Sequence, residues 1–216
     1  MRAYLFDLDG TLIDHFAAIH RCYAYTLGRM GLPEPTPAQV RAAVGGGIEN
    51  SLSKFIAPDR FAEAIAIYRE FWDRTMLEQV YLMPGAKELL EGLHARGTAM
   101  GVLTNKLGSS SRLICDKLAI TPLVKVVLGA QDTPWLKPRP ELTRLAIERL
   151  GARADECLLV GDSPFDIEAA HAGGLTAWVV TTGTHSAEQL LAAGADRVFP
   201  DLWRIGEELG LALAAS

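Results

Sequence analysis

The stretch that decides the fold lies near the start of the chain and reads Ala3-Tyr4-Leu5-Phe6-Asp7-Leu8-Asp9-Gly10-Thr11-Leu12. The apolar run at residues 3–6 is typical of a buried first strand, and two carboxylates follow it one residue apart. Although a strand alternates its faces, a chain that leaves the strand at Gly10 can turn both carboxylates toward one opening. Ligands of open α/β sheets bind at the carboxyl ends of the strands. The stretch therefore predicts a metal or phosphate site at the end of this strand.

The composition of the chain indicates a folded protein with a large core. It has 216 residues, of which 49% are hydrophobic, and a formal net charge of −5. This length suits one α/β domain or a core with an inserted module. The acidic balance, without a basic stripe, argues against a nucleic-acid partner. No apolar run approaches the ~20 residues of a membrane helix, and the early Asp pair leaves no room for a signal peptide.

The cysteines predict a reducing compartment. Cys22, Cys115 and Cys157 are far apart and form no CxxC pair, and no histidine stands at metal-ligand spacing from any of them. This pattern is not that of a disulfide framework, so we expect each thiol to fill apolar space. We therefore expect a cytoplasmic protein without disulfides.

Strand-like and helix-like segments alternate over most of the chain. Apolar strand-like runs lie at residues 3–8, 99–103, 123–128, 157–160, 176–180 and 197–199. Helix-like segments lie at residues 85–96, 109–118, 140–150, 164–172 and 202–214. Gly97 and Gly151 follow two of these, at the position where a helix end favours glycine. Continuous apolar strands that alternate with amphipathic helices predict an α/β fold with a doubly wound, mostly parallel sheet.

One long interval interrupts this alternation. Most of residues 14–80 is typical of helices alone, including a long amphipathic segment at residues 61–77. Thr36-Pro37-Ala38-Gln39 has the pattern of a capping box with proline at the first helical position. We predict a helical module inserted over residues 15–80 and a core formed by residues 1–14 and 81–216, with Pro84-Gly85 at the return to the core.

Polar side chains follow several of the predicted strands. The segments that carry them are Asp7-Leu8-Asp9, Thr104-Asn105-Lys106, Lys137-Pro138, and Gly161-Asp162-Ser163 with Asp166. Because the carboxyl ends of parallel strands share one edge of a sheet, we expect these side chains to converge. Several carboxylates in one cleft repel each other and any phosphate, but Mg²⁺ would offset their charge. Lys137 and donors at Thr104 and Asn105 could then hold phosphate oxygens.

These motifs, in this order, resemble those of the haloacid dehalogenase superfamily of phosphohydrolases. The resemblance covers almost the whole chain, and it implies a Rossmann-like core with an inserted helical cap placed after the first strand. It implies that Asp7 is the nucleophile that forms an aspartyl-phosphate, and that Asp9 is the general acid and base.

The resemblance also implies the ligands of the site. Asp7, the backbone carbonyl of Asp9 and Asp162 would hold Mg²⁺, with Asp166 as a further ligand or as an outer carboxylate. Thr104 and Asn105 would bind phosphate, and Lys137 would bridge phosphate and nucleophile.

Position 9 narrows the activity. Superfamily members that cleave carbon–halogen or carbon–phosphorus bonds lack an Asp there. The runs around Thr104, Lys137 and Asp162 resemble those of phosphoglycolate phosphatases. We therefore predict a Mg²⁺-dependent phosphomonoester hydrolase that acts on a small phosphorylated metabolite as a monomer or homodimer.

Two other functions stay open. A sugar phosphomutase similar to β-phosphoglucomutase also keeps the second Asp, but such enzymes usually carry Ser where this chain has Thr104. A binding protein that holds a ligand without turnover is disfavoured, because it needs no nucleophile and acid pair.

The remaining candidates carry weaker signals. Gly45-Gly46-Gly47 is either an interhelical turn or a source of backbone N–H groups for the substrate, and Arg41 and Asn50 are candidate contacts from the helical module. His15 is either a substrate contact or a linker histidine, of which we expect the second, and we expect Lys106 to be solvated. Trp72 is expected to pack or lie at the surface, and Trp135, which is close to Lys137 in sequence, is a candidate for the rim of the cleft.

Overall fold

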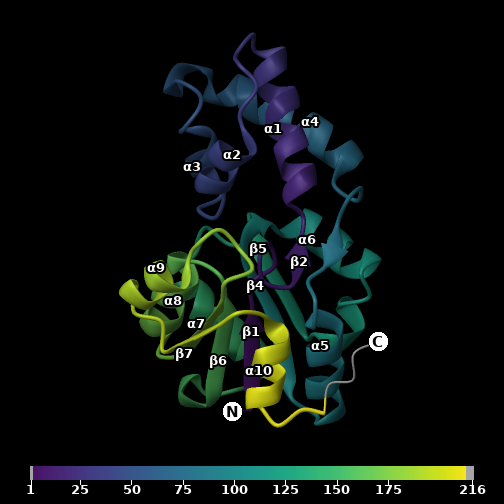
Figure 1. Ribbon diagram of the computed structural model, residues 1–216, viewed down its shortest axis with the longest axis vertical. Coiled ribbons are helices and arrows are strands. Elements are labelled where there is room, and N and C mark those ends of the chain that lie inside the picture. Colours follow the sequence, from purple (N-terminus) through teal and green to yellow (C-terminus); the bar gives the residue numbers. More distant parts are fainter. Residues whose placement is uncertain (1, 213–216) are drawn as a thin grey trace.

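A six-stranded parallel sheet forms the centre of the structure, a computed structural model that describes residues 2–212 (Figure 1). In spatial order, its strands are β5 (Val126–Ala130), β4 (Ala99–Leu107), β1 (Ala3–Phe6), β6 (Cys157–Gly161), β7 (Thr176–Val180) and β8 (Arg197–Phe199). Every pair of neighbouring strands runs parallel. The predicted α/β fold with a parallel, Rossmann-like sheet is confirmed.

The strand order reverses beside β1. From β1 the chain passes to β4 and β5 on one side, then returns to β6 and continues to β7 and β8 on the other. Phe6, the last residue of β1, pairs with Val102 of β4 and with Val160 of β6. Asp7 therefore leaves the sheet level with Leu103 of β4 and with Gly161, the last residue of β6, at the edge where ligand sites of open α/β sheets form.

Helices cover both faces of the sheet. Tyr4 and Phe6 belong to one hydrophobic cluster, which includes residues of α5 (Ala86–Ala95), α6 (Gly108–Lys117) and α10 (Leu202–Glu208). Ala3 and Leu5 belong to a second cluster, which includes residues of α7 (Pro140–Leu150), α8 (Pro164–Gly173) and α9 (Ala187–Ala192). Because side chains alternate along a strand, β1 must be apolar at every position to serve both clusters.

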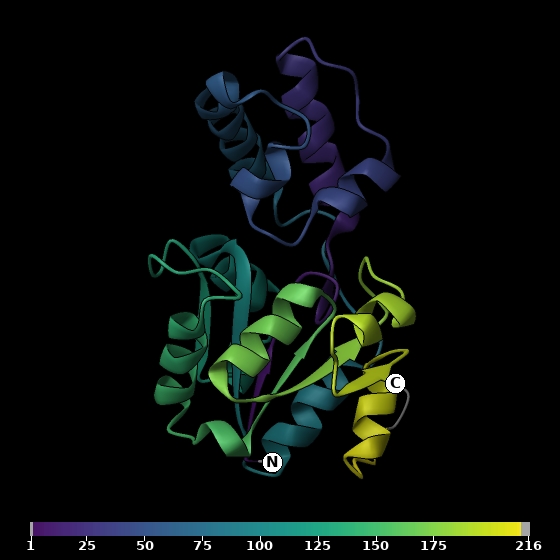
Figure 2. The same ribbon diagram turned by 90° about the vertical axis from the view of Figure 1, so that its left-hand side faces the viewer.

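The helical module stands over the carboxyl edge of the sheet (Figures 1 and 2). Its helices are α1 (Phe16–Arg29), α2 (Pro37–Ala43), α3 (Ile48–Leu52), the 3₁₀ turn η1 (Pro58–Arg60) and α4 (Phe61–Thr75). Where the chain enters and leaves it, β2 (Ile13–Asp14) pairs antiparallel with β3 (Tyr81–Leu82), a small sheet that the sequence pattern did not predict. The division of the chain at residues 14/15 and 80/81 stays a prediction.

Several local expectations are confirmed. Thr36 Oγ1 accepts from the Gln39 backbone N–H at 3.3 Å, while Gln39 Oε1 accepts from the Thr36 N–H at 2.8 Å, which completes the capping box. Gly97 and Gly151 have φ values of 69° and 68°, the left-handed conformation that ends a helix.

Other boundaries differ from the expected ones. The strand expected at residues 123–128 begins at Val126, because Pro122 lies in the 3₁₀ turn η2 (Thr121–Leu123). A further 3₁₀ turn, η3 (Ala154–Glu156), precedes β6. The helix expected at residues 61–77 ends at Thr75, and the one expected at residues 202–214 ends at Glu208, with residues 213 and 214 outside the described part. β4 continues to Leu107 rather than ending at Leu103, and its register to β5 shifts between these two residues.

The cysteines and the helices bear on what the sequence predicts for them. Cys22, Cys115 and Cys157 are free and buried. Burial raises the pKa of the Cys22 thiol to about 12, so it behaves as apolar filling. Among residues 2–212, no helix combines the length and the apolar character that crossing a bilayer demands.

Candidate active site

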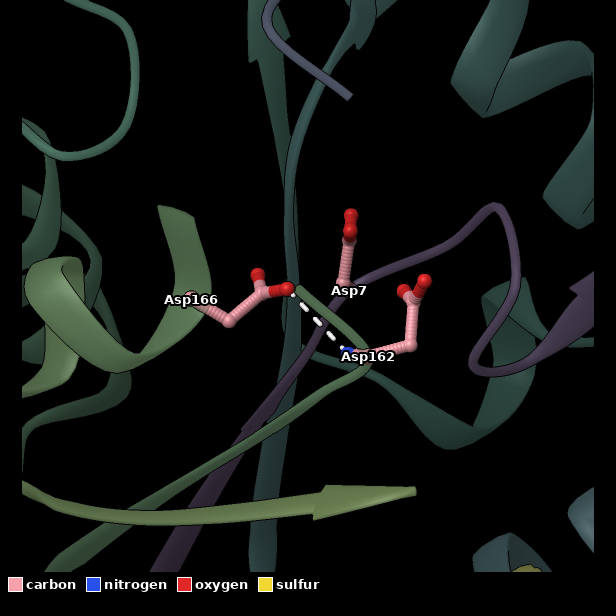
Figure 3. A group of neighbouring side chains, drawn as sticks. All are labelled: Asp7, Asp162 and Asp166. Atoms are coloured by element: carbon pink, nitrogen blue, oxygen red, sulfur yellow. Dashed lines mark hydrogen bonds between the residues drawn. The ribbon is translucent and has the colours of Figure 1, made fainter. Parts of the chain in front are cut away.

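Three carboxylates meet at the carboxyl edge of the sheet (Figure 3). Asp7 follows β1, Asp162 follows β6, and Asp166 lies in the first turn of α8. One oxygen from each carboxylate lies within 4.8 Å of the oxygens from the other two. In Figure 3 the side chains of Asp7 and Asp162 stand side by side, and Asp166 reaches toward them from its helix. Residues far apart in sequence therefore share one site, as the strand-end argument requires.

A single buried amine lies among these carboxylates. Lys137 Nζ is 3.0 Å from Asp7 Oδ1 and 2.6 Å from Asp166 Oδ1. Burial alone would lower the pKa of Lys137, but Asp166 and Asp7 raise it above the ordinary value. Lys137 therefore stays charged beside the candidate nucleophile.

Asp166 is fully engaged by its neighbours. While Oδ1 pairs with Lys137, Oδ2 accepts from the Ser163 N–H at 3.0 Å, the Ser163 hydroxyl at 2.6 Å and the Asp162 N–H at 3.2 Å. These contacts fix both Lys137 and the turn that carries Asp162. Of the two roles that the sequence left open for Asp166, they favour the outer carboxylate over the direct metal ligand.

The site holds more negative than positive charge. Burial raises the pKa of Asp7 to about 6; Lys137 opposes this shift, and Asp166 adds to it. Burial likewise raises the pKa of Asp162 well above its ordinary value, and Asp166 and Asp7 add to the shift. One amine does not offset three carboxylates, of which Asp162 and Asp166 are buried. A hard divalent cation with oxygen ligands fits both this charge excess and the donor set of Asp7 and Asp162.

Asp9 lies in a separate pair with Lys106. Lys106 Nζ is 2.8 Å from Asp9 Oδ2 and 3.1 Å from Oδ1. His15 Nδ1 is 3.7 Å from Asp9 Oδ1. Burial alone would raise the pKa of Asp9, but Lys106 and His15 hold it well below its usual range. The carboxylate form of Asp9 is therefore favoured in this arrangement.

One expectation about these neighbours is wrong. Lys106 is not solvated: its side chain is 9% exposed, and its ammonium lies 4.5 Å from the centre of the Trp72 ring of α4. His15 lies in the link between β2 and α1; it is 1% exposed and packs against Trp72 at 5.0 Å between ring centres. Trp72 is itself buried, as the packing alternative expected. The spacing of helical residues could not reveal the contact between Lys106 and Trp72, since it joins β4 to the module.

Asn105 ties the site to the helical module. Its Oδ1 accepts from the Lys137 backbone N–H at 2.7 Å, and its Nδ2 donates to the Lys137 carbonyl at 3.1 Å and the Gly45 carbonyl at 3.2 Å. Both polar atoms of the side chain therefore have partners within the protein. The predicted phosphate contact of Asn105 would have to come from its backbone N–H. Thr104 is buried and lines the cavity between the sheet edge and the helical module.

Sequence reasoning missed the supports of Asp162. The Thr11 hydroxyl donates to Asp162 Oδ1 at 3.1 Å, and the Thr182 hydroxyl donates to the Gly10 carbonyl at 2.7 Å. A Cβ on Gly183 would lie 1.7 Å from Asp162 Oδ2, so only glycine allows this approach. The signal that could have found them is the position of Thr182 and Gly183 just after β7, at the same sheet edge.

A cavity of about 450 Å³ lies between the sheet edge and the helical module. Asp7, Asp9, Lys106 and Asp162 line it from the core. From the module it is lined by Arg41, Gly45 and Gly47, among the candidates from the sequence. Asn50 and Trp135 are not among its lining residues, and Trp135 packs against the second hydrophobic cluster instead.

Comparison with known proteins defines the class. The family model of haloacid dehalogenase-like hydrolases matches residues 4–180. The chain is 31% identical over 220 residues to a phosphoglycolate phosphatase of Rhodospirillum rubrum, covering 97% of this chain and 91% of that protein. It is 33% identical to a phosphoglycolate phosphatase of Aquifex aeolicus, covering 81% and 82% of the two chains. A solved structure from Haemophilus somnus, described as a predicted phosphoglycolate phosphatase, has a TM-score of 0.90 at 25% identity and covers 97% of this chain and 98% of its own.

The chain belongs to the haloacid dehalogenase-like hydrolases. The resemblance predicted from its motifs is confirmed, as is the expectation that the protein is an enzyme.

Proposed function

We propose that this protein is a Mg²⁺-dependent phosphomonoester hydrolase that acts through an aspartyl-phosphate on Asp7, in the manner of a phosphoglycolate phosphatase. The observation that carries the proposal is the placement of Asp7 at the end of β1, 3.0 Å from the Lys137 amine and beside Asp162. Phosphoryl transfer needs an aligned nucleophile and positive charge around the phosphate, and this constellation supplies both.

Two displacement steps account for hydrolysis. An Asp7 oxygen forms a bond to phosphorus while the bond from phosphorus to the ester oxygen breaks, and Asp9 gives the departing oxygen the proton that it took from water in the preceding turnover. In the second step Asp9 takes a proton from water, whose oxygen attacks the phosphorus and releases inorganic phosphate and free Asp7. Since Lys106 favours the carboxylate form of Asp9, Asp9 can accept a proton from water in the second step.

The proposed Mg²⁺ would be held by Asp7, the carbonyl of Asp9 and Asp162, with Asp166 orienting Lys137 from behind. When bound, the ion supplies positive charge that lets an anionic phosphate approach an anionic nucleophile. Thr104 and the backbone N–H of Asn105 would donate to phosphate oxygens. The helical module would act as a cap that shields the aspartyl-phosphate from bulk water.

Phosphate release distinguishes this activity from its alternatives. With Mg²⁺ present, we expect inorganic phosphate from acetyl phosphate and from a panel of phosphorylated metabolites that includes phosphoglycolate. A chelator should abolish this release and added Mg²⁺ should restore it. Conversion of a sugar phosphate to its isomer, with a bisphosphate primer and little phosphate release, would instead indicate a phosphomutase.

Location and assembly stay predictions from the sequence. A cytoplasmic protein that acts as a monomer or homodimer on a small phosphorylated molecule is consistent with the proposed chemistry.

A further inference from the structure

The cavity extends from the carboxylates into the helical module, and two hydrogen bonds link the module to the core. Asn105 Nδ2 donates to the Gly45 carbonyl at 3.2 Å, and Trp72 Nε1 donates to the Ser110 hydroxyl of α6 at 3.1 Å. The volume of about 450 Å³ therefore belongs to an arrangement in which module and core are already joined. Cavities of this size accept drug-sized ligands, whereas a two-carbon acid phosphate fills only the catalytic end.

The wall that the module contributes has an apolar part and a polar part. The apolar part includes Ile19, Tyr23, Val44, Ile48 and Tyr68, and the polar part includes Arg41, Glu49, Ser51 and Arg69. Tyr23 and Tyr68 are buried and their rings contact each other at 5.5 Å between centres, so their positions are set by packing. The apolar part of the wall can bury a ring, whereas it offers few partners to the oxygens of a small hydroxy acid or a sugar.

A planar platform lies on the same side of the cavity. The Arg41 guanidinium stacks on the Phe16 ring at 3.9 Å, and both residues line the cavity. Within residues 2–212, no acidic side chain pairs with Arg41. A guanidinium stacked on one ring keeps its opposite face free for a second planar group.

We propose that the substrate is a phosphomonoester whose leaving group carries a planar, apolar ring, held by this wall and by the Arg41–Phe16 platform. The inference rests on the proposed phosphatase activity and narrows its substrate class. The phosphate would lie at Asp7 and Lys137, and the ring would lie toward α1, α2 and α3.

Three alkyl phosphates test the proposal with leaving groups of similar chemistry: ethyl, 2-phenylethyl and 2-cyclohexylethyl phosphate. With Mg²⁺ present, kcat/KM for 2-phenylethyl phosphate should exceed that for ethyl phosphate by about tenfold or more, from burial of the ring. It should exceed that for the cyclohexyl ester by about threefold, since the planar ring alone can stack.

Filling the cavity should remove the preference. Ile48→Trp and Val44→Trp should each lower the ratio of the phenylethyl to the ethyl value by about tenfold. Leu113→Trp on α6, where the native side chain is 46% exposed and outside the cavity lining, is the matched control that should keep the ratio of the unmodified enzyme. Circular dichroism would verify that each variant is folded.

Equal kcat/KM values for the ethyl and phenylethyl esters would overturn the proposal, as would folded Ile48→Trp and Val44→Trp variants with an unchanged ratio. Equal values for the phenyl and cyclohexyl esters would overturn the requirement for a planar ring. If none of these esters, nor acetyl phosphate, released phosphate, the proposed function itself would fail.

Discussion

The two ends of the cavity are built in different ways. At the sheet edge, Asp7 and Asp162 follow neighbouring strands whose register sets them level, and Lys137 and Asp166 lock the group with hydrogen bonds of 2.6–3.2 Å. In the helical module, the lining combines aromatic and aliphatic side chains with a few polar ones such as Arg41, on helices whose chain connections to the core pass through β2 and β3. The sheet edge can therefore conserve one chemistry while the module changes which leaving group it admits.

The largest expected effect is that of removing the nucleophile, which should abolish catalysis at the sheet edge but preserve ligand binding in the helical module. Asp7→Asn keeps the size of the side chain but loses the attacking charge, so phosphate release should fall by about ten-thousandfold or more. Binding of an unreactive phosphonate analogue, measured by calorimetry, should persist because the module is unchanged. Substantial turnover in a folded Asp7→Asn variant would contradict the assignment.

Loss of the proton donor should have a smaller effect that depends on the leaving group. For ethyl phosphate, Asp9→Asn should lower the rate by about a hundredfold to ten-thousandfold. In rapid-quench measurements, formation of the aspartyl-phosphate from acetyl phosphate should suffer less, because its leaving group needs no proton. An equal loss for both compounds would mean that Asp9 only positions other groups.

The close packing of Gly183 against Asp162 should determine how tightly Mg²⁺ binds. Gly183→Ala places a Cβ against Asp162 Oδ2, so the Mg²⁺ concentration for half-maximal activity should rise about tenfold. Gly28→Ala on α1 is the control, since nothing lies within 4 Å of its added Cβ. An unchanged Mg²⁺ requirement in Gly183→Ala would remove Asp162 from the metal site.

The smallest expected effect is a pH shift. Lys106 and His15 lower the pKa of Asp9, so Lys106→Met should raise it. Asp9 acts as a base only above its pKa, so the acidic limb for hydrolysis of the aspartyl-phosphate, in which Asp7 is already esterified, should move to higher pH by about one unit or more. At higher pH the rate should return toward that of the unmodified enzyme. Lys106→Arg keeps the charge and should keep the limb in place; a limb unmoved in Lys106→Met would show that the pair does not set this pKa.

The contrast between the sheet edge and the helical module also explains which features the sequence could predict. Asp7 and Asp162 were predictable because they follow apolar strand runs, and parallel strands align their carboxyl ends. The capping box at Thr36 was equally predictable, since its partners are three residues apart. Both signals are local or periodic.

The contacts that were missed are neither local nor periodic. Lys106 pairs with Asp9 across neighbouring strands and lies over Trp72 of the module, so a lysine that looks solvated in sequence is buried. The side chain of Asn105 forms hydrogen bonds with Lys137 and Gly45, which lie near it only in the folded chain. Gly183 is required by the approach of Asp162; its position just after β7 places it at the same sheet edge, but only the folded chain shows this contact.

The most direct measurement locates the phosphoryl group during turnover. The Mg²⁺-loaded enzyme is mixed with ethyl phosphate and quenched in acid within the first turnovers, and its peptides are analysed by mass spectrometry. The peptide that contains Asp7 should carry a phosphoryl group on that residue, and Asp7→Asn should carry none. A phosphoryl group on any other residue, or steady phosphate release without a labelled Asp7 at any quench time, would contradict the mechanism.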